Sequence, residues 1–277
     1  MEDILTVMSK IVSVQDISCY GQCSLTVALP VLSAYGIETA ILPSGILSTH
    51  TGGFTGFTFL DLTEEMGKIV DHWKKENITY DAIYTGYIGD ARQFDIIKDM
   101  RSMLNPGGLL IVDPAMADHG RLYPALTPDI VDGMRELVKC ADIILPNLTE
   151  AAFLLKEDYR DDYSDEDYVT IAGKLADLGP EKVILTGVGR DGKIGAMCYE
   201  KSTGKITTYL AELQPKSYHG TGDIFSSVVI AKLLDGESIY DTLKDSCEFI
   251  VDCIKATVDD PSHPYGVKFE KVLAARK

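Results

Sequence analysis

The sequence lacks the patterns that mark several large classes of protein. No apolar stretch approaches the length needed to cross a membrane, and residues 1–6 carry no basic segment followed by an apolar one. The 6 cysteines form no CxxC pair, and the 5 histidines show no metal-ligand spacing. We therefore expect a cytoplasmic protein with free thiols, without a zinc site or disulfide bonds.

Positive charge is also scarce. Lys and Arg total 26 against 42 Asp and Glu, which gives a formal net charge of −16. No stripe of Lys and Arg interleaved with aromatic residues appears, so a nucleic-acid partner is not expected. A small anionic nucleotide is still compatible with this surface, because its binding is local and is assisted by a divalent cation.

Common nucleotide-binding and hydrolase motifs are missing as well. The chain has neither a P-loop GxxxxGK[ST] nor a GxSxG nucleophile motif. Residues 187–192 match GxGxxG, but the segment after them has the pattern of a strand, whereas the dinucleotide fingerprint requires a helix there. The pattern therefore argues against a dehydrogenase.

Short apolar runs alternate with longer amphipathic segments along the chain. The runs lack hydrophobic–polar alternation, which is typical of parallel strands buried on both faces. After residue 186, two strands follow each other across a tight turn, and three helices come next. We predict an α/β fold with three layers, a doubly wound and mainly parallel sheet with an antiparallel edge, in a single domain over residues 1–277. The expected strands are 11–14, 39–42, 82–85, 109–112, 143–145, 182–186, 193–199 and 205–210, and the expected helices are 24–35, 63–76, 91–104, 128–139, 148–155, 165–178, 221–234, 239–257 and 267–275.

The strongest chemical signal is the Gly-Thr-Gly-Asp segment 220–223, which leads straight into an apolar helix. Glycines let the backbone approach a ligand closely, and the free N–H groups of a helix start form an anion site. Asp223, in the first turn, could accept a proton from an attacking hydroxyl while the amides stabilise a transferring phosphoryl group. The alternative is an ordinary capped helix with Thr221 as the N-cap.

Two further segments follow predicted strands at the carboxyl edge of the sheet, where open α/β sheets bind ligands. Asn147 and Glu150 lie one helical turn apart, so they could order the water shell of a Mg²⁺ ion. The same spacing could equally form a capping box. After the strand that ends at Asp113, a loop carries Asp118 and Tyr123, which makes it a candidate binding loop.

In their order and spacing, three of these segments resemble the ribokinase-like kinases, and the resemblance covers nearly the whole chain. The segments are Asn147-Leu-Thr-Glu150, Thr186-Gly187 and Gly220-Thr-Gly-Asp223. Three more stretches are similar to the pyridoxal kinases within that superfamily: Leu47-Ser-Thr-His50-Thr51-Gly, Tyr84-Thr-Gly-Tyr87 and the loop from Asp113 to Tyr123. The resemblance implies a cytoplasmic homodimer that uses ATP and Mg²⁺ to phosphorylate the 5′-hydroxymethyl group of pyridoxal, pyridoxine or pyridoxamine.

The resemblance also implies a role for each candidate residue. Asp223 would be the catalytic base, and the amides of residues 220–223 would form the anion hole. Gly220, Thr221 and Gly222 thus count among the catalytic residues. The residues implied to bind ATP or its phosphates are Asp118, Tyr123, Asn147, Thr186, Gly187 and Gly222. Those implied to bind the metal are Asp113, Asn147 and Glu150, and those implied to bind the substrate are Asp16, Thr51, Tyr87 and Asp223.

Two positions depart from the family pattern. The family usually has Ser after the Gln of its first strand, whereas here Asp16 follows Gln15. The Asp16 carboxylate could pair with a protonated ring nitrogen or with an amine and so shift the preferred vitamer, or it could cap the following turn. Leu145 replaces a Thr that the family often uses near a monovalent cation, so the sequence does not decide whether this protein uses such a cation.

Two other functions stay open at this point. A kinase for hydroxymethylpyrimidine or another small alcohol belongs to the same superfamily, although residues 16–23 do not resemble the Ser/Gly-rich first loop of the pyrimidine kinases. A non-catalytic vitamer-binding protein is the alternative from a different class. Asp223 argues against it, because binding alone needs no base.

Overall fold

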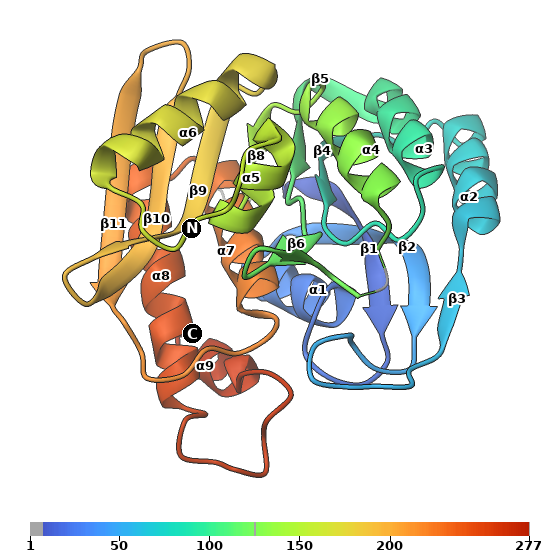
Figure 1. Ribbon diagram of the computed structural model, residues 1–277. Coiled ribbons are helices and arrows are strands. Elements are labelled where there is room, and N and C mark those ends of the chain that lie inside the picture. Colours follow the sequence, from blue (N-terminus) through green and yellow to red (C-terminus); the bar gives the residue numbers. More distant parts are fainter. Residues whose placement is uncertain (1–7, 125, 277) are drawn as a thin grey trace, which may run out of the picture.

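The computed structural model describes residues 8–124 and 126–276. In this part of the chain, a nine-stranded sheet is covered by helices on both faces, and a two-stranded hairpin lies apart from the sheet (Figure 1). The strands are β1 (Lys10–Ser18), β2 (Glu38–Leu47), β3 (Phe59–Asp61), β4 (Tyr80–Thr85), β5 (Leu104–Val112), β6 (Ala117–Asp118), β7 (Arg121–Leu122), β8 (Ile143–Ile144), β9 (Lys182–Arg190), β10 (Lys193–Glu200) and β11 (Lys205–Glu212). The helices are α1 (Leu25–Ala34), α2 (Thr63–Lys75), α3 (Gln93–Met100), α4 (Pro128–Val138), α5 (Leu148–Leu155), α6 (Asp165–Leu178), α7 (Thr221–Leu234), α8 (Ile239–Lys255) and α9 (Phe269–Ala275).

No helix within these residues is both long and apolar enough to cross a bilayer. The prediction made for residues 1–6 concerns a segment that lies outside the described residues.

The strand order of the sheet is β11-β10-β9-β8-β5-β4-β1-β2-β3. The five central pairings, from β9 to β2, are all parallel, while β10 and β11 are antiparallel to their neighbours. The predicted parallel sheet with an antiparallel edge is therefore confirmed. At the other edge β3 adds a second antiparallel strand, which the sequence did not reveal because a three-residue strand shows no periodicity.

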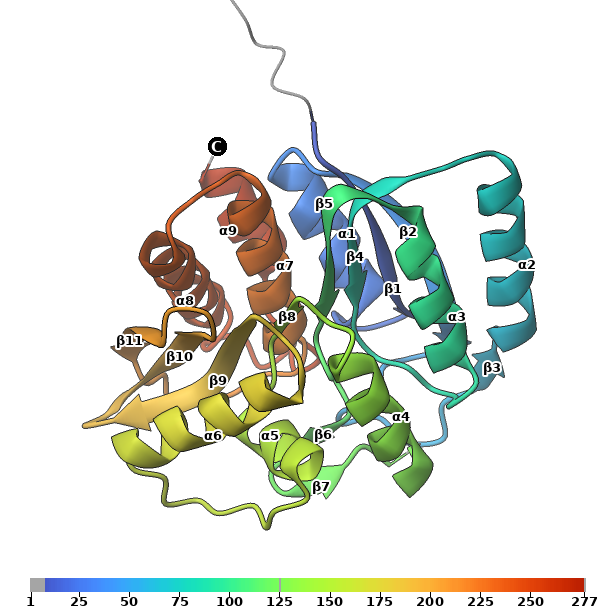
Figure 2. The ribbon, with the colours of Figure 1, turned by 90° about the horizontal axis from the view of Figure 1, so that it is seen from above.

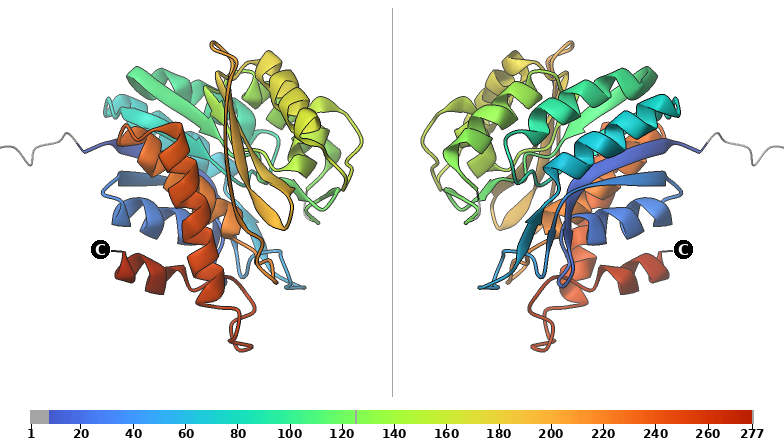
Figure 3. Two further views of the ribbon diagram at one scale, coloured as in Figure 1. Left: turned by 90° about the vertical axis from the view of Figure 1, so that its left-hand side faces the viewer. Right: turned by 90° about the vertical axis from the view of Figure 1, so that its right-hand side faces the viewer.

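Two layers of helices bury the two faces of the sheet. Helices α2 to α6 cover one face, where Met66, Phe94 and Met134 belong to one apolar cluster with strands β1, β4 and β5. Helices α1, α7 and α8 cover the other face, and α9 packs on the outside of that layer. Viewed from above and from the side, the two layers lie on opposite sides of the strands (Figures 2 and 3). The three predicted layers are present.

Several predicted boundaries are wrong: β1, β2 and β5, for example, are longer than the strands expected over 11–14, 39–42 and 109–112. The helix expected over 91–104 ends at Met100, and after a short 3₁₀ turn Leu104 already begins β5. The strand expected over 182–186 continues to Arg190, because Gly187 (φ 78°) allows a bulge and Val188 points back into the core with 1% exposure. A hairpin turn follows at residues 190–193, as the strand pattern after GxGxxG indicated. The last helix begins at Phe269, two residues later than expected.

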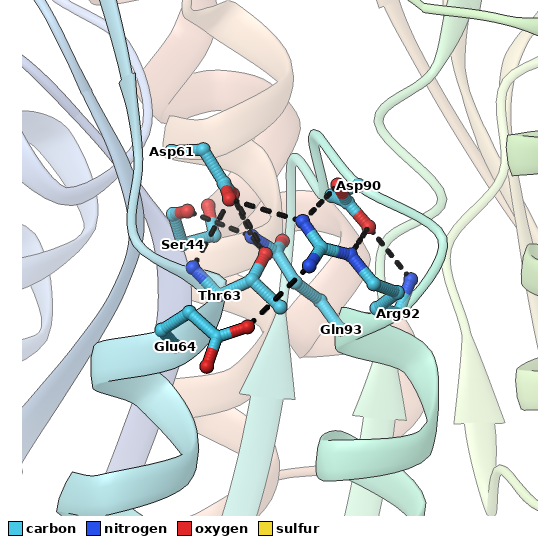
Figure 4. A network of polar contacts seen from close by, with 7 residues as sticks. All are labelled: Ser44, Asp61, Thr63, Glu64, Asp90, Arg92 and Gln93. Carbon is cyan, nitrogen blue, oxygen red and sulfur yellow. Dashed lines mark hydrogen bonds and ion pairs between the residues drawn. The ribbon is translucent and has the colours of Figure 1, made fainter.

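Gln93 ties the start of α3 to the β2–β3 edge of the sheet (Figure 4). Its Nε2 donates a hydrogen bond to the carbonyl oxygen of Ser44 at 2.8 Å and lies 3.0 Å from Oγ1 of Thr63 and 3.2 Å from a carboxylate oxygen of Asp61. The Gln93 side chain is completely buried, so no water molecule can take the place of its Nε2 as the donor to these acceptors.

The neighbouring Arg92 takes part in the same network from the solvent side (Figure 4). Its guanidinium lies 2.8 Å from a carboxylate oxygen of Asp90, 3.4 Å from Asp61 and 3.5 Å from Glu64, but its side chain is 60% exposed. Exposed ion pairs of this kind contribute little to stability, because water screens the charges.

We therefore expect Gln93→Ala to lower the free energy of unfolding by about 1–3 kcal/mol, because it leaves buried acceptors without a donor. Arg92→Ala, the matched control in the same network, is expected to cost less than about 1 kcal/mol. Equilibrium urea unfolding of both variants measures the difference. An equal loss in the two variants would contradict this account of the network.

Candidate active site

The predicted site residues lie at the carboxyl edge of the parallel strands. Asp16 lies near the end of β1. Asp113 directly follows β5, and Tyr87 lies two residues after the end of β4. Asn147 follows β8 and forms a parallel backbone bridge with Thr186 of β9. Since parallel strands present their carboxyl ends at one edge of a sheet, these side chains from distant parts of the sequence share one region.

Helix α7 begins at this edge without a side-chain cap. Its N-cap is Gly220 (φ 78°), not Thr221 as the capping alternative required, and the Thr221 hydroxyl instead donates to the carbonyl oxygen of Tyr218 at 3.0 Å. The first N–H groups of the helix are thus left free to bind an anion. A Cβ at Gly220 would lie 1.8 Å from the carbonyl oxygen of Gln22, so only glycine fits there.

Asp223 lies in the first turn of α7, beside these amides. One carboxylate oxygen, Oδ2, accepts a hydrogen bond from the backbone N–H of Ser24 at 2.9 Å. Burial is the main cause that raises the pKa of Asp223 to about 7; the charges of Asp113 and Asp16 act in the same direction, and the Ser24 hydrogen bond acts in the opposite direction. A carboxyl group with a pKa near neutrality can both accept and release a proton at neutral pH.

Asp113 is linked to the same helix from the sheet side. Its Oδ2 accepts a hydrogen bond from the Ser226 hydroxyl at 2.6 Å, and its Oδ1 accepts one from the N–H of Ala115 at 3.1 Å. Burial raises the pKa of Asp113 to about 6. Ser226 lies three residues after Asp223, so the contact fixes α7 against the end of β5.

Asn147 and Glu150 form the capping box that the sequence left open. Oδ1 of Asn147 accepts from the N–H of Glu150 at 2.9 Å, and Oε2 of Glu150 accepts from the N–H of Asn147 at 2.9 Å. Oε1 of Glu150 accepts from Met116 at 3.0 Å, and Nδ2 of Asn147 donates to Ala117 at 2.8 Å. Burial raises the pKa of Glu150, and the nearby charge of Asp113 raises it further.

These contacts limit how the three predicted metal ligands could hold a cation. In the part of the chain that the structure describes, no group of three His, Cys, Asp or Glu side chains is arranged to bind a metal directly. Every carboxylate oxygen of Asp113 and Glu150 already accepts a hydrogen bond. The donor set therefore fits a Mg²⁺ ion that keeps its water shell better than one that is stripped of water.

Asp118 ends β6, and Tyr123 directly follows β7 in the same hairpin. The hairpin is attached to α5 through a hydrogen bond from the N–H of Gly120 to the Thr149 hydroxyl at 3.1 Å. Asp118 is exposed, whereas burial raises the pKa of Tyr123, as do the charges of Glu150, Asp118, Asp223 and Asp113. The hairpin thus brings Tyr123 among the carboxylates of the site, and the sequence did not predict the two short strands that position it.

Asp16 and Tyr87 form a buried polar region next to Asp223. Asp16 is 3% exposed and accepts a hydrogen bond from the Ser18 hydroxyl at 2.8 Å. Burial raises the pKa of Asp16 and that of Tyr87, and the charge of Asp16 adds to the effect on Tyr87. Asp16 is therefore buried near Asp223, and its role in binding a vitamer stays a prediction.

Thr51 lies half-buried in the loop after β2, near the start of α7. A Cβ at the adjacent Gly52 would lie 2.4 Å from Nδ1 of His219, so this loop packs directly on the residue before Gly220. His219 also contacts His50, with ring centroids 5.6 Å apart. The loop that carries Thr51 is thus close to the anion site, and the contact of Thr51 with a vitamer ring stays a prediction.

Thr186 and Gly187 are also placed near the site, although within β9 and not at its end. The backbone N–H of Thr186 donates to the carbonyl oxygen of Pro146 at 2.9 Å, which holds β9 beside the start of α5. Gly187 is exposed and leaves its surroundings open to a ligand.

Two residues of the site were missed from the sequence. Ser226 could have been found, because a polar residue three positions after Asp223 stands out in an apolar helix. Ser24 offered no signal, since serine at a helix start is ordinary and its backbone contact with Asp223 links residues 199 positions apart.

Comparison with known proteins gives a consistent result. A family model described as phosphomethylpyrimidine kinase matches residues 34–265. A putative phosphomethylpyrimidine kinase from Bacteroides thetaiotaomicron, solved with pyridoxal, is 39% identical with a TM-score of 0.92, over 97% of this chain and 95% of that one. A pyridoxal kinase from Lactobacillus plantarum is 30% identical with a TM-score of 0.88, over 96% of each chain. A pyridoxal kinase from Histophilus somni is 29% identical over 98% of this chain and 95% of its own length. The predicted ribokinase-like fold is confirmed.

The raised pKa of Asp223 predicts a stability effect that depends on pH. A folded-state pKa of about 7, above the ordinary value of 3.8, means that the ionised carboxylate destabilises the folded protein. This cost grows as the pH rises from 5 to 8, so Asp223→Asn should become more stable than the unaltered protein by on the order of 1–3 kcal/mol over that interval. Urea unfolding at both pH values measures it, with Asp129→Asn, which removes an exposed carboxylate from the first turn of α4, as the control. The same stability difference at both pH values would refute the buried, ionising carboxylate.

Proposed function

The chain belongs to the phosphomethylpyrimidine kinase family, and we propose that it transfers the terminal phosphate of ATP to the 5′-hydroxymethyl group of pyridoxal, pyridoxine or pyridoxamine. The observation that carries this proposal is the placement of Asp223, a carboxyl group with a pKa near neutrality, beside the uncapped amides of α7. The pyridoxal-bound relative with 39% identity supports a vitamer as the acceptor.

The chemistry follows from that placement. Asp223 accepts the proton of the 5′-hydroxyl group while the 5′-oxygen forms a bond to the γ-phosphorus of ATP. The bond between that phosphorus and the β,γ-bridging oxygen breaks, which releases ADP. The amides of Gly220, Thr221, Gly222 and Asp223 stabilise the negative charge of the transferring group, because they are free N–H groups at the positive end of a helix.

The vitamer ring is assigned to the region next to Asp223. Asp16 and Tyr87 are buried there, and the loop that carries Thr51 closes against His219. The Asp16 carboxylate is suited to a protonated ring nitrogen or to the amine of pyridoxamine, because a buried carboxylate gains most from a cationic partner.

The ATP phosphates are assigned to the opposite side of the anion site. The contacting residues are Asp118, Tyr123, Asn147, Thr186, Gly187 and Gly222. Asp113, Asn147 and Glu150 would hold Mg²⁺ through its water shell, and the ion would neutralise charge on the phosphates. Leu145 is 2% exposed and offers no side-chain oxygen, so its side chain supplies no ligand for a monovalent cation.

Two broader features are part of the same proposal. The chain acts as a single kinase domain, in line with the pairing of its long strands in one sheet. It forms a homodimer, a common state of soluble enzymes. The exposed side chains of Phe59 and Leu60 on edge strand β3, at 43% and 58%, are compatible with such pairing.

We expect Asp223→Asn to lower kcat for pyridoxal by about 10²–10⁴-fold with little change in KM for ATP, because the variant keeps the shape of the side chain but loses the base. ATP consumption with pyridoxal, pyridoxine, pyridoxamine and hydroxymethylpyrimidine measures this, and Asp129→Asn is the control. Turnover with hydroxymethylpyrimidine alone would move the chain to the pyrimidine kinases. Binding of a vitamer without ATP turnover would identify a binding protein.

Asp16 should set the order of preference among the vitamers. In Asp16→Ser, kcat/KM for pyridoxamine is expected to fall about tenfold more than for pyridoxine, because the amine loses a charged hydrogen-bond partner. The Asp16→Asn variant can still accept the hydrogen bond from Ser18 but has no negative charge. A change in relative kcat/KM that both variants show is therefore due to the lost charge. Unchanged relative kcat/KM values for the three vitamers would exclude this role.

A further inference from the structure

Asp223 is held from outside its own helix. Its hydrogen bond from the N–H of Ser24, at 2.9 Å, is the contact that fixes Oδ2, and Oδ1 accepts no hydrogen bond from the residues that the structure describes. Ser24 is the N-cap residue of α1 and Asp223 lies in the first turn of α7, so two helix N-termini meet at one carboxylate. Both favour its ionised form.

The Ser24 backbone has a strained conformation at this contact. Its φ of 54° and ψ of −133° fall in a region that glycine adopts readily and that other residues avoid because of their Cβ atom. Such strain persists only where surrounding contacts enforce it, and it is concentrated at functional sites.

Several contacts of Ser24 enforce the strained conformation. Its backbone forms an antiparallel bridge with Ile17, and its carbonyl oxygen accepts hydrogen bonds from Val27 at 3.0 Å and Ala28 at 2.8 Å. Its side chain is 6% exposed and lies near the Asp16 carboxyl group. Ser24 is therefore a neighbour of Asp16 through its side chain and binds Asp223 through its peptide N–H.

We propose that Ser24 is a positioning residue, which orients Asp223 through its backbone N–H and is itself held in a strained conformation by its bridge to Ile17 and by the hydrogen bonds to its carbonyl oxygen. This inference rests on the function proposed above, because it concerns the base of that reaction. It leaves Oδ1 of Asp223 free for the substrate hydroxyl. Ser24 thereby lies between Asp16, which is assigned to the vitamer ring, and Asp223, the base.

The test compares Ser24→Ala with Ser24→Gly. Both variants lose the hydroxyl, but only glycine adopts the required backbone without strain. We expect kcat of Ser24→Ala to fall about tenfold below that of Ser24→Gly, since small displacements of a catalytic group are costly. The acid limb of kcat against pH should also lie at higher pH in Ser24→Ala, because a carboxylate that loses a hydrogen bond becomes harder to ionise. The titratable groups facing Asp223 in these profiles are Asp16, Cys23, Tyr84, Asp113 and Tyr123.

Asn77 provides the matched control. It has almost the same φ, 55°, in the turn after α2, far from the site in sequence and in the fold. Asn77→Ala and Asn77→Gly should differ in the midpoint of urea unfolding and not in kcat. If Ser24→Ala does not fold, Ser24→Asn replaces it, because asparagine tolerates positive φ better than alanine.

The outcomes separate the inference from the proposed function. Equal kcat and equal acid limbs in the two Ser24 variants, with the unaltered protein active on a vitamer, would overturn the positioning role alone. A larger loss in Ser24→Gly than in Ser24→Ala would also overturn it, because relief of strain could not then be the cause. An unaltered protein that phosphorylates no vitamer would remove the proposed function and this inference together.

Discussion

The close contact between the loop after β1 and the start of α7 is the constraint on which the whole site depends. Gly220 lies so near the carbonyl oxygen of Gln22 that any side chain there would force the two segments apart. A few residues on, Ser24 holds the Asp223 carboxylate. Because β1 is a central strand and α7 covers the sheet, this contact fixes the anion-binding amides relative to the strand ends that carry the other site residues. A shift of α7 would therefore disturb the base and the anion site at once.

The site concentrates acidic groups that stability alone would disfavour. Burial raises the pKa of Asp16, Asp113, Glu150 and Asp223, and in the last two the charge of Asp113 adds to the effect. A cluster of buried carboxyl groups costs folding free energy and is retained where function needs it. Here the positive charges would arrive with the ligands, as Mg²⁺ and as a protonated vitamer. The capping box of Asn147 and Glu150 is compatible with the metal role proposed for these side chains, since capping side chains can also order the water around an ion.

Much of the fold could be predicted from the sequence, because periodicity and turn residues report local structure well. Helices α5, α6 and α7 have the predicted bounds, and the strand after residues 187–192 excluded a dinucleotide site. The missed strands β3, β6 and β7 are two or three residues long, too short to carry a periodic signal. In the site, motif residues such as Asp223 were visible because their spacing is local. Ser24 was not, because its importance comes from a backbone conformation and from a contact that only the folded chain creates.

The most direct measurement of the central claim is the distance from the Asp223 carboxylate to the substrate hydroxyl. A crystal structure with pyridoxal, Mg²⁺ and a non-hydrolysable ATP analogue provides it. The account predicts that Oδ1 of Asp223 lies within about 2.6–3.2 Å of the 5′-oxygen, with γ-phosphate oxygens on the amides of residues 220–223. A 5′-hydroxyl group directed away from Asp223, or phosphates bound elsewhere, would contradict it.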